Sequence, residues 1–555
     1  MDKWKWWLLG GIVVLAAVLR LTWLDKYPAG FTPDEAAFGY NAYSLLQTGR
    51  DEWGIPFWQL PFTNLRSFGD YKMPLYAFLT VPSVALFGLN EFAVRFPNAL
   101  LGTLAVVIIY FIPLSLIKRG GQPAHWQAGG EFVGIASALL LSISPWHMPL
   151  SRGAFEANLI TLLLPLAIVL FFKHIYLLSS IFYALTFYSY HSAKLITPLS
   201  FFGLFFIFRV KPTRKITRPL VVFMVLFLPA FYSLLFSNSR AAEVSIFNPG
   251  SALTEMSKSR LRLIQSGWSP FRARLVENKY IYIGTTFIKN YFSYFASKYL
   301  FSEGPAESTY GMIPGWGVLN WVQLPFLLVF IFQAYKTRNL SSKYLLFLLL
   351  ISPLPAALTK GPGYAANRAA MMVIPLTIMT ALGFIQTLKL IKTKSLKRLI
   401  SLISLLFLIC GLGMYTKVFI QKSPALHSGG MGYGYRQLTE YLVSCMDKYG
   451  EIRISRTLSE AHIYFAFYSH YPPRIYQTHS PAWSDFEKLG FSFLDQYDGY
   501  HIGKIRFGDL NYQRRDKGNI LYVGRPDDFP DTAVKAVIST YPDSSPAIVS
   551  VTQNP

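Results

Sequence analysis

Residues 96–117 read FPNALLGTLAVVIIYFIPLSLI, a run of 22 residues without a charged side chain. At 1.5 Å per residue, a helix of this length crosses the hydrocarbon core of a bilayer. Comparable apolar runs recur along the chain, and together they predict eleven transmembrane helices. The predicted spans lie near residues 6–24, 96–117, 132–149, 158–172, 175–190, 195–208, 219–236, 317–334, 343–358, 369–388 and 399–416.

The composition points to the same class of protein. Of the 555 residues, 52% are hydrophobic and only 15% are charged, whereas soluble proteins carry roughly a quarter charged residues. A soluble globular chain and a disordered chain are therefore both excluded. The sequence predicts a mostly α-helical, polytopic membrane protein.

The net charge of +23 is distributed unevenly. Residues 1–416 hold 37 basic and 15 acidic side chains, whereas residues 417–555 hold 15 and 14. Basic residues gathered in short loops between apolar runs follow the positive-inside rule, so the charge indicates orientation and no nucleic-acid partner. With a cytoplasmic N-terminus, every dense basic cluster lies inside. The first helix, which lacks a cleavage motif, is expected to be retained.

This orientation places three long segments on the outer face of the cell membrane: residues 25–95, residues 237–316 and the tail, 417–555. The apolar stretch 74–92 is interpreted as a juxtamembrane helix at the outer interface, broken by Pro82, because counting it as a span would put the two largest basic clusters outside.

The tail contains strand-like runs at 451–457 and 519–524 and a helical pattern at 435–448. Its length of about 139 residues is that of a domain. We therefore predict a membrane domain over residues 1–416 and a small extracytoplasmic α/β domain over residues 417–555. Cys410 and Cys445 suggest neither a disulfide framework nor a thiolate metal cluster.

Two acidic positions follow apolar runs on the predicted outer side. Thr32-Pro33-Asp34-Glu35 has the pattern of a helix start, in which Glu35 bonds back to the cap and Asp34 stays free for chemistry. Glu156 lies between the third and fourth spans. Ionisable side chains at membrane depth are costly and indicate function, but Glu156 also fits a solvated charge at a helix start.

Two basic positions, Lys72 and Arg95, lie on the same side near the headgroup level. A basic side chain beside an interfacial helix suits a lipid phosphate, although a lysine at this depth also extends to the surface for its own solvation. A divalent cation bridging phosphate and carboxylate is chemically reasonable, but no ligand set in the sequence establishes it.

The order of these motifs resembles a known family. Asp34-Glu35 after the first helix, Lys-x-Pro-Leu-Tyr at 72–76 and Arg-x-Pro-x-Ala-Leu-x-Gly at 95–102 resemble the GT-C glycosyltransferases of family 39. That family includes protein O-mannosyltransferases and the transferase that adds aminoarabinose to lipid A. The resemblance covers residues 5–210 and continues more loosely through 295–317 and 358–375.

The resemblance implies transfer of a sugar from a polyprenyl-phosphate carrier to an acceptor on the outer face of the membrane, and we expect a protein, lipid or glycan acceptor. One carboxylate is enough for a single displacement, which inverts the anomeric centre. It implies that Asp34 is the general base and that Lys72 binds the carrier phosphate. Glu156 matches a second acidic position, where several relatives have Asp. The expected site is completed by Glu35 on the catalytic side and by Arg95 and Arg368 as phosphate ligands.

Two other functions stay open at this point. A non-catalytic lipid or sugar transporter would use ionisable residues near mid-span, whereas here they gather at one face. A ligase or polymerase of diphosphate-linked glycans would use the same outer face. The arginines of the 237–316 segment, such as Arg260, Arg262, Arg272 and Arg274, suit either kind of donor.

Overall fold

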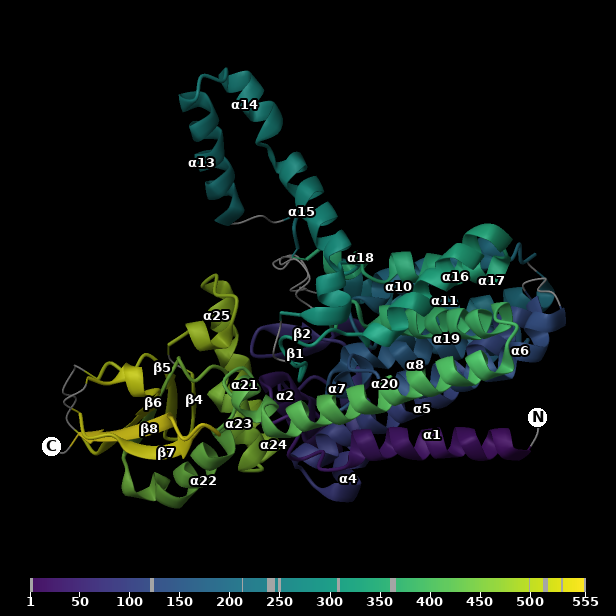
Figure 1. Cartoon of the computed structure of the whole chain (residues 1–555). Helices are drawn as coiled ribbons and strands as arrows, with labels where there is room; N and C mark the ends of the chain where they lie inside the picture. Colours follow the sequence, from purple (N-terminus) through teal and green to yellow (C-terminus); the bar gives the residue numbers. More distant parts are fainter. Residues whose placement is uncertain are drawn as a thin grey trace.

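The computed structural model describes residues 3–119, 124–211, 213–236, 245–247, 251–306, 310–359, 366–498, 500–512, 518–530 and 533–553. A helical bundle carries a smaller domain with a β-sheet at one end (Figure 1). Within these ranges, six segments are helical, long and apolar enough to cross a membrane. They are α1 (Lys3–Leu21), α5 (Glu91–Arg119), α11 (Arg214–Phe236), α17 (Leu340–Ile351) with α18 (Leu354–Ala357), α19 (Val373–Leu390) and α20 (Lys394–Gln421).

The remaining predicted spans coincide with further helices. These are α6 (Ala124–Ser142), α8 (Ile160–Phe172), α9 (Tyr176–Thr186), α10 (Ala193–Ile207) and α16 (Leu324–Thr337). The predicted span 132–149 is divided, because the chain leaves α6 before Pro145 and resumes as the single turn α7 (His147–Leu150). A proline removes a backbone donor, which favours a helix end before it.

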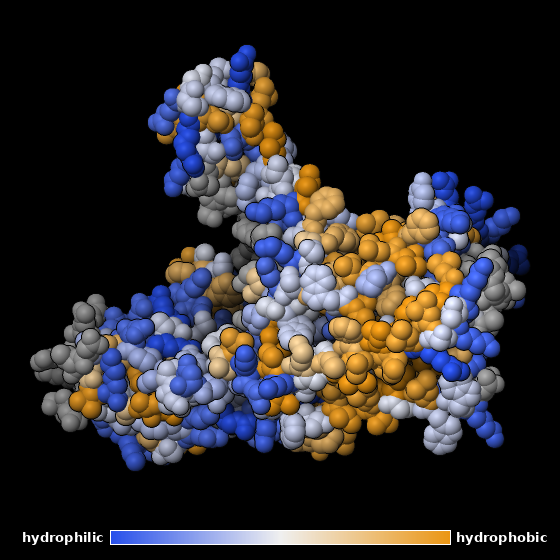
Figure 2. Space-filling view, in the orientation of Figure 1, coloured by the Kyte–Doolittle hydropathy of each residue, from blue (hydrophilic) through white to orange (hydrophobic). Residues whose placement is uncertain are grey.

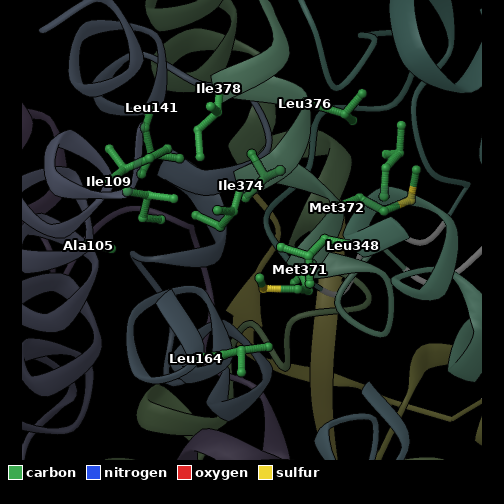
Figure 3. Close-up of a cluster of buried hydrophobic side chains, with 14 of the residues drawn as sticks. Ala105, Ile109, Leu141, Leu164, Leu348, Met371, Met372, Ile374, Leu376 and Ile378 are labelled. Carbon is green, nitrogen blue, oxygen red and sulfur yellow. The ribbon is translucent and has the colours of Figure 1, made fainter. Parts of the chain in front are cut away.

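The bundle has a continuous hydrophobic interior. Figure 3 shows part of it, formed by side chains from five helices and the segment before α19: Ala105, Ile109, Leu141, Leu164, Leu348, Met371, Met372, Ile374, Leu376 and Ile378. The outside of the bundle is also hydrophobic over a broad area (Figure 2), as on α20, where Leu402 and Phe407 are exposed. A bundle that is apolar both inside and outside is suited to lipid. The chain is an integral membrane protein.

Between α1 and α5 the chain forms α2 (Pro33–Thr48), α3 (Leu60–Thr63), a hairpin of β1 (Leu65–Ser67) and β2 (Asp70–Lys72), and α4 (Leu75–Phe87). The predicted break at Pro82 is wrong. Helix α4 continues through this proline and ends at Gly88, whose φ of 77° is one that glycine adopts readily.

The predicted start of α2 is confirmed. The Thr32 hydroxyl accepts a hydrogen bond from the Glu35 amide at 3.2 Å, and the Glu35 carboxylate accepts one from the Thr32 amide at 2.9 Å. Pro33 occupies the first turn, where its missing N–H costs nothing. The cap therefore uses Glu35 and leaves Asp34 available.

A buried ion pair fixes this segment to the bundle. Arg95 Nε lies 2.8 Å from Glu35 Oε1, and both side chains have no exposed surface. The Arg95 guanidinium also donates to the carbonyls of Leu24 at 3.1 Å and Pro28 at 3.0 Å. One arginine thus joins the end of α1, the start of α2 and the first turns of α5.

Residues 237–316, predicted only as a large loop, contain helices α13 (Ser251–Gln265), α14 (Pro270–Val276) and α15 (Lys279–Ser293), which project from the bundle in Figure 1, and the short π-helical turn η2 (Lys298–Ser302). Residues 237–244, 248–250 and 307–309 of this prediction lie outside the described ranges.

The C-terminal part contains a six-stranded sheet in the order β4-β5-β3-β6-β8-β7. Its strands are β3 (Glu451–Ser455), β4 (His501–Ile502), β5 (Ile505–Gly508), β6 (Ile520–Gly524), β7 (Ala536–Thr540) and β8 (Pro546–Gln553). Strand β3 is parallel to both β5 and β6, and the other pairs are antiparallel. The predicted strands at 451–457 and 519–524 and the helix at 435–448 are confirmed by β3, β6 and α22 (Tyr435–Cys445).

This domain shares a hydrophobic core with the segment after α1. Side chains of α2 and α4 cluster with those of α22, α23 (Ala461–Tyr468) and the sheet. The Tyr464 hydroxyl donates to the Phe31 carbonyl at 2.7 Å, and the Ser480 hydroxyl donates to the Glu52 carbonyl at 2.8 Å. The C-terminal domain is therefore packed directly onto the first long loop.

Glu52 is buried in this contact region. Its carboxylate accepts a hydrogen bond from the Ser67 hydroxyl at 2.6 Å, behind the β1–β2 hairpin. Desolvation raises the pKa of Glu52 to about 8, against the opposing effect of the Ser67 hydroxyl. A carboxyl with a raised pKa in the folded state stabilises the fold while protonated. This contribution is present below pH 4.5, the usual pKa of Glu, and is lost as the pH rises through about 8.

We expect Arg95→Met to destabilise the protein by about 3–5 kcal/mol, because it leaves the Glu35 carboxylate buried without its partner. Thermal unfolding of the purified protein in detergent measures this. The double variant Glu35→Gln/Arg95→Met should regain part of the loss. Lys488→Ala, which removes an exposed ion pair with Asp485, serves as the control and should shift unfolding little. Equal effects of Arg95→Met and Lys488→Ala would contradict the assigned role.

We expect Glu52→Gln to reduce the pH dependence of stability. The wild type should lose melting temperature as the pH rises from about 5 to about 9, because Glu52 must ionise while buried. The glutamine retains an oxygen that accepts from Ser67 and does not ionise. Melting curves across this range should show a shallower decline for Glu52→Gln, whereas the exposed control Glu303→Gln should keep the wild-type slope. Parallel curves for wild type and Glu52→Gln would contradict the interpretation.

Candidate functional site

A cavity of about 970 Å³ lies where the bundle meets the C-terminal domain. Its walls come from segments that are far apart in the sequence: the start of α2, the β1–β2 hairpin, the turn before α8, the α9–α10 connection, the segments flanking α13–α15, α18 with residues between it and α19, and the C-terminal domain. The lining includes Thr32, Asp34, Phe68, Asp70, Lys72, Phe155, Glu156, Tyr190, His191, Lys194, Ser245, Phe247, Tyr310, Thr359, Arg368, Arg456, Ser459, Glu460, Asp495 and Gln496.

Lys72 and two carboxylates form the centre of this lining. Lys72 Nζ lies 3.0 Å from Asp34 Oδ1 and 3.0 Å from Asp70 Oδ2. The lysine side chain is 3% exposed, whereas that of Asp34 is 38% exposed. The Phe68 ring lies 4.2 Å from Nζ and adds a cation–π contact. The ammonium is therefore fixed in place, and the Asp34 carboxylate remains accessible from the cavity.

The electrostatics keep Lys72 charged. Burial disfavours its ammonium form, but the adjacent Asp34 and Asp70 carboxylates outweigh this effect and raise the pKa of Lys72 above its usual value. His191 behaves differently. Burial, together with Lys194, lowers the pKa of His191 to about 4, so its imidazole is neutral near pH 7, with Nε2 2.9 Å from the Tyr71 carbonyl.

Glu156 lies in the 3₁₀ turn η1 (Glu156–Leu159), ahead of the first residue of α8. Desolvation, followed by repulsion from the Asp34 carboxylate, raises the pKa of Glu156 to about 8. Near pH 7 this carboxyl is largely protonated. Glu156 therefore faces the cavity mainly as a neutral carboxyl group.

The cavity brings together four of the residues expected from the sequence: Asp34, Lys72, Glu156 and Arg368. Arg368 follows Asn367, whose side-chain amide donates to the Tyr190 hydroxyl at 3.1 Å. Glu35 and Arg95 do not line the cavity. They lie behind it as the buried ion pair, where Arg95 is enclosed by carbonyls and by Glu35.

Several lining residues were not expected to belong to the site. Lys194 and His191 lie between two predicted spans, 175–190 and 195–208, and the sequence analysis assigned them no role. The C-terminal domain adds Arg456, Glu460 and Asp495. Nothing in the local sequence of that domain signals a site, because these residues face the cavity only through the packing of two distant segments.

The described part of the chain contains no group of three histidine, cysteine or carboxylate side chains placed to hold a metal ion. The cluster around Lys72 has carboxylates from Asp34 and Asp70, both already paired with the ammonium.

No model of a known protein family matches the sequence, and no curated protein matches it. Solved structures do match in fold. ArnT from Cupriavidus metallidurans in the apo state is 11% identical over 99% of this chain and 97% of its own, with a TM-score of 0.53. The same protein bound to undecaprenyl phosphate is 12% identical over 99% and 98%, with a TM-score of 0.50.

An oligosaccharyltransferase from Archaeoglobus fulgidus matches 83% of this chain and 61% of its own, with 13% identity and a TM-score of 0.45. At these identities the likeness concerns the fold. The two ArnT structures match nearly the full length of both chains, from the first helix through the C-terminal sheet. The expected architecture is confirmed: the chain has the fold of the GT-C glycosyltransferases.

Proposed function

We propose that this protein is a membrane glycosyltransferase that moves a sugar from a polyprenyl-phosphate carrier to an acceptor hydroxyl on the outer face of the membrane. The observation that carries the proposal is the Asp34–Lys72 pair, 3.0 Å apart, in a cavity at one end of an apolar bundle. The crystal structure of ArnT with undecaprenyl phosphate supports a carrier of this class.

Lys72 binds the carrier phosphate. A phosphate monoester anion needs cationic stabilisation when it leaves, and the enclosed ammonium provides it with little competition from water. Lys72 is held by the Asp34 and Asp70 carboxylates. The incoming phosphate replaces Asp34 as a partner of Lys72 and so releases the Asp34 carboxylate. Arg368 and Lys194 line the same cavity and add positive charge on the side of the bundle.

Asp34 is the general base. Its carboxylate accepts the proton of the acceptor hydroxyl while that oxygen bonds to the anomeric carbon of the sugar. The bond from the anomeric carbon to the phosphate oxygen breaks at the same time, and the carrier departs as polyprenyl phosphate. One carboxylate is sufficient for this single displacement, which inverts the anomeric centre. Glu156, which is largely protonated near pH 7, supports the site as a hydrogen-bond donor.

The C-terminal domain forms the wall that faces the acceptor. Its Glu460 and Asp495 give this wall a negative character, in contrast to Lys72, Lys194 and Arg368 on the side of the bundle. Arg456 adds little positive charge, because it is paired with Asp498 and Asp509 at 2.8 Å each. The donor phosphate is therefore held by the bundle, and the acceptor enters beside the domain.

The arrangement disfavours a transporter. A transported substrate needs polar groups along its path, whereas the basic and acidic side chains that line the cavity gather at one end of the bundle.

The proposal is tested by incubating the purified protein with acceptor candidates and a panel of sugar donors. The panel contains both polyprenyl-phosphate and polyprenyl-diphosphate sugars. Consumption of a monophosphate donor is expected. Consumption of diphosphate donors alone, or of none across a broad panel, would contradict it.

We expect Asp34→Asn to lower the rate of transfer by roughly 10²–10⁴-fold, because the amide cannot accept the acceptor proton. Binding of the donor, measured separately, should persist. Asp70→Asn is the matched control, since Asp70 also lies 3.0 Å from Lys72 but is assigned no proton transfer. A much smaller loss is expected there. Wild-type turnover by Asp34→Asn, or equal losses in both variants, would reject the assignment.

We expect Lys72→Gln to raise the KM for the donor about 10- to 100-fold, which corresponds to the loss of one charge-assisted hydrogen bond to phosphate. The KM for the acceptor should change far less. Lys298→Gln is the control, because that lysine is 75% exposed and outside the cavity. Steady-state kinetics with both substrates varied measure the difference. An unchanged KM for the donor in Lys72→Gln would show that the phosphate is bound elsewhere.

A further inference from the structure

Residues 251–293 form an arm of three helices, α13, α14 and α15, that projects sideways from the bundle near the end that carries the C-terminal domain (Figure 1). Helices α13 and α15 are amphipathic. Ile281, Ile288 and Phe292 are seven and four residues apart and share one face of α15, and all three are exposed. Phe271, at the start of α14, is 72% exposed. The arm thus presents hydrophobic side chains that the described chain leaves uncovered.

The arm is also strongly basic. It contains seven lysine or arginine residues and two glutamates. The side chains of Lys258, Arg262, Arg272 and Arg274 are exposed. The C-terminal domain is nearly neutral, with 15 basic and 14 acidic residues from position 417 onward, so it offers the arm no net complementary charge. A binding partner that fits this surface is anionic and accepts hydrophobic side chains.

The position of the arm indicates which binding partner this is. In Figure 2, hydrophobic atoms of the arm lie along its edge on the side of the bundle, and hydrophilic atoms lie along its edge on the side of the C-terminal domain. The hydrophobic outside of the bundle is the part that lipid surrounds. A surface next to it meets lipid headgroups, where amphipathic basic helices bind with their apolar side chains inserted.

Both ends of the arm are fixed to the wall of the cavity. Before α13, Ser245 forms a β-bridge with Thr359, and near the end of α15 the Asn290 side-chain amide donates to the Thr359 carbonyl at 2.8 Å. Ser245, Phe247 and Thr359 all line the cavity. Lipid held by the arm therefore lies beside the cavity.

We propose that the arm binds the anionic lipid surface of the leaflet on the side of the C-terminal domain, with its apolar face among the headgroups and its basic side chains on lipid phosphates. The arm then concentrates phosphate-bearing lipids next to the cavity. That consequence rests on the proposed function, whereas the binding of the arm to lipid does not require transfer of a sugar.

The test places an environment-sensitive fluorophore on the full-length protein in nanodiscs. After replacement of Cys410 and Cys445 by alanine, Phe271→Cys and, separately, Ile288→Cys carry the label on the apolar side. Gln265→Cys carries it on the polar side, three and seven residues from Arg262 and Lys258. Nanodiscs contain either phosphatidylcholine alone or about 30% phosphatidylglycerol, with and without lipids that carry a quencher near the headgroup.

Lipid quenching is expected at positions 271 and 288, more strongly with phosphatidylglycerol, and little is expected at position 265. Replacing Lys258, Arg262, Arg272 and Arg274 by glutamine should lower the preference for the anionic lipid. We expect this preference to fall about fivefold for each positive charge that is removed. Labels that stay water-exposed at 271 and 288 would overturn the proposal. So would labels that are shielded from water but not quenched by lipid, which would place the arm against protein. Because quenching needs no donor, this outcome is independent of the transfer assay.

Discussion

The buried carboxylate of Glu35 is the constraint on which the candidate site depends. Glu35 accepts hydrogen bonds from the Thr32 amide, the Arg95 guanidinium and the Ala154 amide, all within 3.0 Å. An unpaired carboxylate in this position would be very costly, so these three partners must be present together. They belong to the start of α2, to α5 and to the segment just before Glu156. The spacing between Asp34 and Glu156 is therefore set by a residue that does not face the cavity.

Lys72 is positioned by a second buried group. The β1–β2 hairpin pairs Leu65 with Lys72, and the Ser67 hydroxyl on β1 donates to the Glu52 carboxylate. The Glu52 carbonyl in turn accepts from Ser480 of the C-terminal domain. The C-terminal domain thus contacts the segment that holds the hairpin, and it also forms one wall of the cavity. In an enclosed site of this kind, charges interact more strongly than in water, which suits Lys72 to an anionic ligand.

The sequence was sufficient for features that depend on local pattern. Four consecutive residues, Thr32 to Glu35, predicted the helix cap and predicted that Glu35, not Asp34, bonds to it. The apolar runs predicted the helices of the bundle. The sequence was insufficient where the same local pattern fits two different surroundings of a side chain. Arg95 near the start of a span fits a phosphate ligand as well as a buried partner of Glu35, and only the fold separates them. Glu460 and Asp495 reach the cavity across more than 400 residues of sequence from Asp34, a distance that no local pattern encodes.

The ion pair between Asp34 and Lys72 gives the proposed reaction an order. Asp34 Oδ1 lies 3.0 Å from Lys72 Nζ, so the ammonium occupies the carboxylate oxygen that the proposal assigns to the acceptor proton. A donor phosphate supplies the ammonium with a new partner, and only then does the Asp34 carboxylate become available to an acceptor hydroxyl. Asp70, which is less exposed than Asp34, remains on Lys72 and keeps it in position during this exchange. In the proposed reaction, two carboxylates at equal distance from one lysine therefore have separate tasks: Asp70 anchors the ammonium, and Asp34 is released by the donor phosphate.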